Sequence, residues 1–321
     1  TVLDGIRQKV SKETRVLYAK GCAVRDSSRT GFKDAIETAR NADAVVMVMG
    51  GSSARDFSSE YEETGAAKVT INQISDMESG EGYDRATLHL MGRQLELLEE
   101  ISRLGKPVVL VLIKGRPLLM EGAIQEAEAI VDAWYPGMQG GNAVADVLFG
   151  DYNPAGRLTL SVPRSVGQLP VYYNTRRKGN RSRYVEEPGT PRYPFGYGLS
   201  YTTFSYTDMK VQVTEGSDDC RVDVTVTIQN GDEVAQLYFR DDVSSFTTPA
   251  KQLRAFSRIH LKAGESREVT FTLDKKSLAL YMQEGEWVVE PGRFTIMVGG
   301  SSEDIACRQA FEINRKYTFK M

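Results

Sequence analysis

Three short runs of apolar residues, separated by stretches with helical spacing, constrain the fold of this chain most strongly. The runs are DAVVMVMGG (43–51), KPVVLVLIKG (106–115) and AIVDAWYPG (129–137). Helical spacing is found at residues 31–42, 90–105 and 140–151. Strands without alternating polar positions are buried on both faces, as in parallel sheets that crossover helices cover on both sides. We therefore predict a mostly parallel α/β sandwich over residues 1–165.

The second half of the chain has a different pattern. Residues 166–203 are rich in Pro, Tyr, Arg and Gly and show little periodicity, so we expect an extended linker there. From residue 204 onward, short β-type runs alternate with turn signals such as NGD, KAGE and EPG. Strands of this length and spacing predict an all-β, immunoglobulin-like sandwich over residues 204–321.

The composition limits the classes of partner and site that we expect for this chain. The 321 residues carry 40 basic and 43 acidic side chains, which argues against a nucleic-acid partner. No apolar run is long enough for a membrane helix, so we expect no membrane partner. Cys22, Cys220 and Cys307 lack metal-ligand spacing, and we interpret them as buried free thiols, although Cys220 and Cys307 could pair. We expect no cofactor and no metal, and catalysis, if present, to rest on carboxylates.

The stretch MESGEGYDR (77–85) is the strongest candidate for such chemistry. It could be a solvated loop, a metal site or part of a catalytic site. Glu81 lies between two glycines, in the connection that follows a buried strand, where ligands of open α/β sheets bind. A carboxyl with other carboxylates nearby, here Asp76, Glu78 and Asp84, holds its proton more strongly, as a general acid requires.

Other residues of this region are weaker candidates. Glu78 and Glu81 would face each other only on a helix, which the two glycines disfavour. Tyr83, two residues from Glu81, is the aromatic residue best placed to stack on a ligand. Tyr61 and Phe57 are alternatives, whereas Trp134 on a buried strand is expected to fill the core. Arg116 in IKGRP is expected to pair with a carboxylate such as Asp84.

Several longer motifs resemble glycoside hydrolase family 3. SGEGYDRATLHLMGRQLELL (79–98) and AWYPGMQGGNAVADVLFGDYNPAGRLTLSVPRSVGQLPVYYN (133–174) resemble its α/β sandwich domain. RYPFGYGLSYTTFSY (192–206) resembles its linker. GDEVAQLYFRD (231–241), PAKQLRAFSRIHLKAGES (249–266) and VEPGRFTIMVGGSS (289–302) resemble its fibronectin type III-like domain. The motifs follow the order of the family over nearly the whole chain.

The resemblance implies a retaining exo-β-glycosidase, most often a β-glucosidase, with an oligosaccharide or β-glucoside as substrate. In such proteins a (β/α)8 barrel carries the aspartate nucleophile, and a six-stranded α/β sandwich lends the acid/base glutamate. The run SGEGY places that role on Glu81, with Tyr83 near the leaving-group subsite and Glu78 as the reserve candidate.

The 321 residues contain no barrel, so we interpret the chain as the C-terminal part of a longer protein whose barrel is its partner domain. Alone, it should be inactive. Relatives often have several more residues after the asparagine of IQNGDEV, so Asn230-Gly231 predicts either a two-residue hairpin or a position where a flexible loop is missing. A β-xylosidase, a non-catalytic glycan-binding or structural module, and a nucleotide-binding domain remain alternatives, although phosphate-binding glycines are missing. We leave the compartment open, with a periplasmic or secreted location as the expectation.

Overall fold

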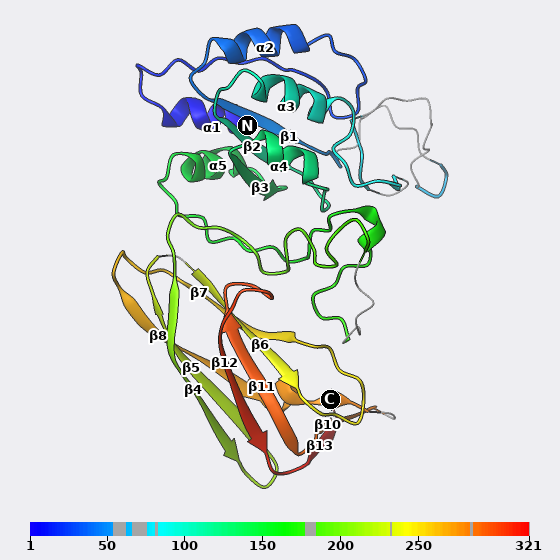
Figure 1. Cartoon of the computed structure of the whole chain (residues 1–321), viewed down its shortest axis with the longest axis vertical. Coiled ribbons are helices and arrows are strands. Elements are labelled where there is room, and N and C mark those ends of the chain that lie inside the picture. The colour runs from blue at the N-terminus through cyan, green and yellow to red at the C-terminus, as the bar shows by residue number, and fades with distance from the viewer. Residues whose placement is uncertain are drawn as a thin grey trace. The chain divides into compact units, whose positions relative to one another are not determined.

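The structure is a computed structural model that describes residues 1–53, 62–65, 76–80, 83–176, 184–231, 233–282 and 285–320. Within them the chain forms two compact units (Figure 1). The first unit consists of residues 1–152 and 164–167, and the second of residues 153–163 and 168–321. Each unit is built around its own sheets.

The first unit alternates helices and strands. Its elements are α1 (Val2–Lys9), α2 (Phe32–Arg40), β1 (Val45–Gly50), α3 (Gln94–Ser102), β2 (Val108–Ile113), α4 (Glu121–Glu126), β3 (Ala129–Trp134) and α5 (Gly140–Leu148). The strands form a parallel sheet in the order β1-β2-β3. The predicted parallel α/β architecture is therefore confirmed, and the described residues contribute three strands where the resemblance implied six.

Helices cover both faces of this sheet, with α2 and α3 on one side and α1 and α5 on the other (Figure 1). Leu110 and Leu112 of β2 are fully buried on the α3 side, where Leu98 also has no exposed surface. On the opposite face Val111 packs with Val2 of α1 and Val144 of α5. Burial on both faces explains why β2 reads as a continuous apolar run.

The two helices α1 and α5 approach each other through glycines. A Cβ on Gly5 would lie 2.1 Å from the carbonyl oxygen of Gly141, and a Cβ on Gly141 would lie 2.1 Å from that of Thr1. Only glycine allows this backbone contact. The helix at the start of the chain is thereby fixed to the last helix of the same unit.

The second unit is built almost entirely from strands. They are β4 (Ser205–Glu215), β5 (Cys220–Gln229), β6 (Glu233–Asp241), β7 (Gln252–Ile259), β8 (Ser266–Asp274), β9 (Leu280–Tyr281), β10 (Glu286–Val289), β11 (Gly292–Gly299), β12 (Ile305–Ile313) and β13 (Tyr317–Lys320). The short helices η1 (Val166–Gln168) and α6 (Lys275–Leu278) complete the described elements. All described pairings in this half are antiparallel.

A sandwich core holds the second unit together. The sheets β4-β5-β8 and β12-β11-β6-β7 contribute alternate side chains to one hydrophobic cluster, to which β5 adds Val222, Val224, Val226 and Ile228. The predicted β-sandwich is confirmed. Cys22, Cys220 and Cys307 are free, as expected, but only Cys220 is buried.

The predicted hairpin at Asn230-Gly231 is wrong. Both residues have positive φ, 71° and 70°, as the short turn requires. The strands on either side, however, pair with different partners, β5 with β4 and β8, and β6 with β7 and β11. The chain therefore passes from one sheet of the sandwich to the other at this point.

Candidate functional site

The candidate stretch lies at the carboxyl edge of the parallel sheet. After β1 ends at Gly50, Ser52 forms a parallel bridge with Met77. The carbonyl oxygen of Ser52 accepts hydrogen bonds from the amides of Glu78, at 2.8 Å, and Ser79, at 3.3 Å. Residues 77–79 therefore run beside the end of β1, at the edge where parallel α/β sheets bind ligands.

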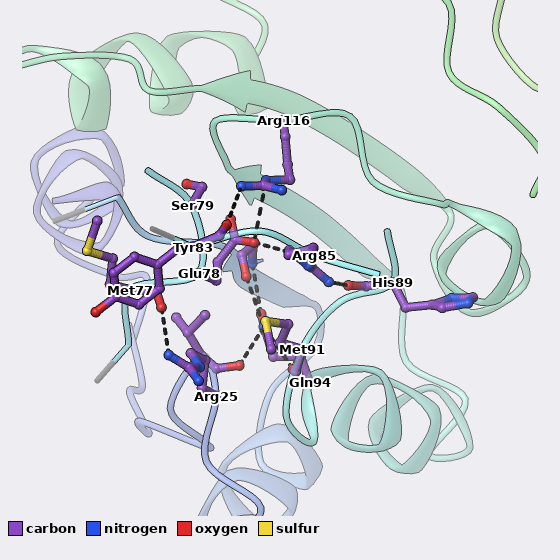
Figure 2. A network of polar contacts seen from close by, with 12 residues as sticks. Arg25, Met77, Glu78, Ser79, Tyr83, Arg85, His89, Met91, Gln94 and Arg116 are labelled. Carbon is purple, nitrogen blue, oxygen red and sulfur yellow. Dashed lines mark hydrogen bonds and ion pairs between the residues drawn. The ribbon is translucent and has the colours of Figure 1, made fainter. Parts of the chain in front are cut away.

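A second set of contacts fixes the start of this stretch. Asp76 Oδ1 accepts hydrogen bonds from the amides of Val24 at 3.0 Å and Arg25 at 3.4 Å. The guanidinium of Arg25 donates in turn to the carbonyl oxygen of Met77 at 2.9 Å (Figure 2). Asp76, which the sequence suggested as a neighbouring acid, therefore holds backbone amides in place.

Gln94 binds the backbone beside the candidate stretch, where β1 ends. Its buried side chain accepts a hydrogen bond from the amide of Gly50 at 2.8 Å and donates to the carbonyl oxygen of the same residue at 2.9 Å. Its amide nitrogen also donates to the carbonyl oxygens of Val24 and Met91. One side chain at the start of α3 thus satisfies the backbone where β1 leaves the sheet.

Among the described carboxylates of the stretch, Glu78 is the most enclosed, with 1% of its side chain exposed. Its Oε2 accepts from Arg85 Nη1 at 2.5 Å and lies 3.8 Å from Arg116 Nε (Figure 2). Its Oε1 faces Gly51, where an added Cβ would lie 2.0 Å from that oxygen. Glycine at position 51 therefore makes room for the carboxylate, and the two arginines compensate its charge.

Arg116 and Arg85 reach beyond Glu78. Arg116 Nη2 donates to the carbonyl oxygen of Tyr83 at 3.4 Å, and the guanidinium of Arg85 donates to the carbonyl oxygen of His89. The amide of Tyr83 donates to the carbonyl oxygen of Gly80 at 3.1 Å. Arg116 pairs with a carboxylate, as expected, but that carboxylate is Glu78 and not Asp84, which is exposed.

The predicted site residues have different outcomes. Glu81, Phe57 and Tyr61 lie outside the described residues. The reserve candidate Glu78 is buried and paired with arginines. Tyr83 is half-buried, and its contacts given by the structure are those of its backbone.

The sequence did not reveal a buried lysine next to the site. Lys114 has 1% of its side chain exposed, and its Nζ lies 2.8 Å from Asp132 Oδ2. The ammonium also lies 3.8 Å from the ring centre of Trp134. Burial lowers the pKa of Lys114, and Asp132 opposes that shift. The expectation that Trp134 fills the core is wrong, because its side chain is half-buried. Its φ is 53°, and the β2–β3 register shifts where Trp134 pairs with Ile113.

Ser79 contacts the end of the third strand. Its hydroxyl oxygen lies 3.3 Å from that of Tyr135. The Tyr135 ring packs against Gly115, where an added Cβ would lie 2.5 Å from a ring carbon. Segments that follow β1, β2 and β3 therefore meet in one cluster of polar contacts.

Among the described residues, no group of three or more His, Cys, Asp or Glu side chains is arranged to hold a metal ion. In the same part of the chain, no helix has the length and apolar character to cross a membrane.

Comparison with known proteins identifies the family. Residues 1–201 match the glycosyl hydrolase family 3 C-terminal domain, and residues 233–302 match the fibronectin type III-like domain. A β-xylosidase of Formosa agariphila is 43% identical over 94% of this chain and 40% of its own length. The periplasmic β-glucosidase of Salmonella typhimurium is 37% identical over 94% of this chain and 41% of its own length.

Solved structures give the same result. A β-glucosidase from Erythrobacter marinus superposes with a TM-score of 0.82 at 34% identity, over 97% of this chain and 43% of its own. The glucose complex of a β-glucosidase from Listeria innocua gives 0.75 at 32% identity, over 92% and 39%. This chain spans about 40% of the length of the curated relatives named here. It belongs to glycoside hydrolase family 3, of which it comprises the C-terminal α/β domain and the fibronectin type III-like domain.

Proposed function

We propose that this chain is the C-terminal part of a retaining exo-β-glycosidase that releases terminal, non-reducing β-D-glucosyl residues. The observation that carries the proposal is the family match over both domains, together with the acidic stretch whose described residues 77–79 lie beside the carboxyl edge of the parallel sheet. Relatives named as β-glucosidases support glucose as the sugar. The 43% identity to a β-xylosidase makes xylosides the second candidate.

In the proposed mechanism two carboxyl groups act in turn. An aspartate on a (β/α)8 barrel attacks the anomeric carbon while Glu81 protonates the departing glycosidic oxygen. Glu81 then removes a proton from water, which attacks the glycosyl-enzyme ester, releases the sugar and restores the aspartate. The configuration at the anomeric carbon is retained, because it inverts twice.

The environment of Glu78 favours Glu81 as the proton donor. A general acid must come within hydrogen-bond distance of the substrate oxygen. The Glu78 carboxylate is enclosed by Gly51, Arg85 and Arg116 and has 1% of its side chain exposed. It suits a structural ion pair better than proton transfer to a glycoside. Tyr83 remains our proposal for a contact near the leaving-group subsite.

The test uses the full-length protein that contains this chain, with aryl β-glucosides and β-xylosides. Glu81→Gln should lower kcat/KM about 10²- to 10⁴-fold for substrates with poor leaving groups. The loss should be much smaller for activated aryl glycosides, whose phenolate leaves without a proton. Glu13→Gln, at an exposed glutamate, is the matched control and should leave both rates unchanged. Equal losses on both substrate types would count against Glu81 as the acid.

A non-catalytic glycan-binding module is the rival from another class. Such a module would bind glucose or an oligosaccharide without the rest of the protein. Titration calorimetry of the 321-residue chain with these sugars separates the two functions, because half of a divided active site should bind them weakly or not at all.

A further inference from the structure

We propose that Arg116 is a positioning residue for the acid/base segment, an inference that rests on the proposed function of Glu81. The guanidinium of Arg116 touches the chain on both sides of positions 81 and 82. Its Nε lies 3.8 Å from Glu78 Oε2, and its Nη2 donates to the carbonyl oxygen of Tyr83 at 3.4 Å (Figure 2). One planar side chain therefore connects the residue before the SGEGY run with the residue that ends it.

The two sides are also joined directly. The amide of Tyr83 donates to the carbonyl oxygen of Gly80 at 3.1 Å. On the first side, the backbone amides of Glu78 and Ser79 are bound by Ser52 at the end of β1. On the N-terminal side of Glu81, the described residues are therefore bound to the end of β1. On its C-terminal side, Tyr83 is bound by Arg116.

Arg116 is suited to this task by its place in the fold. It follows β2, which is the middle strand of the described sheet, and is separated from it by Lys114 and Gly115. Lys114 is held by the carbonyl oxygen of Trp134 and by Asp132. The backbone that carries Arg116 is therefore anchored independently of the segment that it touches, as a positioning group requires.

Because Arg85 also compensates the charge of Glu78, Arg116 can be replaced without leaving that carboxylate unpaired. Removing the only partner of a buried carboxylate leaves an uncompensated charge and damages folding. Here Arg85 Nη1 stays 2.5 Å from Glu78 Oε2 when Arg116 is replaced. The Arg85 side chain is 7% exposed and the Arg116 side chain 25% exposed. We therefore assign charge compensation mainly to Arg85, which also joins the two sides through Glu78. To Arg116 we assign the contact that holds Tyr83 to the segment following β2.

The expected effect follows from how sharply acid catalysis depends on geometry. A misplacement of about 1 Å can cost about 10²-fold in rate. If Arg116 sets the position of the acid, its loss should weaken proton donation more than substrate binding. Poor leaving groups need the proton and should suffer, whereas activated leaving groups should be nearly unaffected. A purely structural loss would instead reduce the amount of active protein and lower both rates by one factor.

The experiment compares Arg116→Gln and Arg116→Lys in the full-length protein, with aryl β-glycosides of graded leaving-group pKa. For Arg116→Gln we expect kcat/KM to fall about 10- to 100-fold on the poorest leaving group and less than about 3-fold on the best. Arg116→Lys should recover only part of this, because an ammonium lacks the planar fork that reaches two acceptors. Arg103→Gln, at a side chain that is 71% exposed, is the matched control.

Each outcome decides between the two proposals. A leaving-group dependence in Glu81→Gln without one in Arg116→Gln overturns the positioning role and leaves the proposed function standing. The lack of such a dependence in Glu81→Gln overturns the proposed function itself. Failure of both Arg116 variants to fold, measured by circular dichroism, would show that this arginine is a folding residue and would also overturn the positioning role.

Discussion

At the scale of single residues, burial decides the behaviour of carboxyl groups more than sequence neighbours do. Asp241 ends β6 as a buried residue. Burial raises its pKa to about 6, and the charge of Glu290 adds to the shift, whereas a hydrogen bond from the amide of Val243 opposes it. The folded protein therefore binds a proton at Asp241 more tightly than the unfolded chain does.

Asp241→Asn should remove a pH-dependent loss of folding stability. The native aspartate favours folding below about pH 3.8 and loses that contribution as pH rises through about 6. The variant should thus be more stable than the parent at pH 8, by about 1–3 kcal/mol, and similar to it near pH 4. Urea unfolding followed by Trp287 fluorescence, in a Trp134→Phe background, measures the difference. A stability gain independent of pH would contradict this origin.

The site shows what single-residue patterns can and cannot predict. The acidic run and its position after β1 are visible in the sequence. The difference between Glu78 and its neighbours is not, because it depends on Gly51 and on Arg116, which other segments bring to the carboxylate. Asp84, which the sequence suggested as a partner of Arg116, is exposed, whereas the Glu78 carboxylate is buried beside Arg116.

At the scale of elements, a buried ion pair ties the extended chain at 153–163 to the β-sandwich within the second unit. Arg157 Nη2 lies 2.9 Å from Glu233 Oε1 at the start of β6, with 7% and 2% of the side chains exposed. Burial raises the pKa of Glu233, and Arg157 opposes this shift. Loss of Arg157 alone would therefore leave the Glu233 carboxylate buried without a compensating charge.

Removing one partner of this pair should destabilise the second unit, whereas replacing both partners with apolar residues should not. Arg157→Met leaves a buried, uncompensated carboxylate and should destabilise the second unit by about 3–5 kcal/mol. Arg157→Met combined with Glu233→Leu should recover most of that loss. Arg221→Met, in the exposed pair with Asp223, should cost less than about 1 kcal/mol. The same Trp287 fluorescence measures all three variants, and equal losses in the two single variants would contradict the role of burial.

The inner strands of the β-sandwich were all predicted from the sequence, but only one of its edge strands was. The β-type runs that pointed to the sandwich include the inner strands β5, β6 and β11 and the edge strand β8. No such run marked β4, β7 or β12, which lie at the other edges of the sheets β4-β5-β8 and β12-β11-β6-β7, where more polar residues are tolerated. In β4 the register also shifts between Thr207 and Lys210, which interrupts the alternation.

At the scale of the whole molecule, the relatives named above are much longer than this chain. The chain covers 43% of the Erythrobacter marinus structure and 40% of the Formosa agariphila relative. Retaining glycosidases need a nucleophile and an acid/base about 5–5.5 Å apart. Our proposal places the acid/base on this chain and the nucleophile on a barrel, so each part alone has half of the chemistry.

The 321-residue chain should therefore fold but not turn over an aryl β-glucoside or β-xyloside, even an activated one. An activated leaving group removes the need for the acid but not for the nucleophile, so the missing aspartate should still abolish the first step. The rate should equal that of the same chain carrying Glu81→Gln, with circular dichroism confirming that both are folded. The longer protein should restore turnover by several orders of magnitude. Hydrolysis by the chain above the Glu81→Gln background would mean that a complete active site lies within these residues, and would overturn the divided-site proposal.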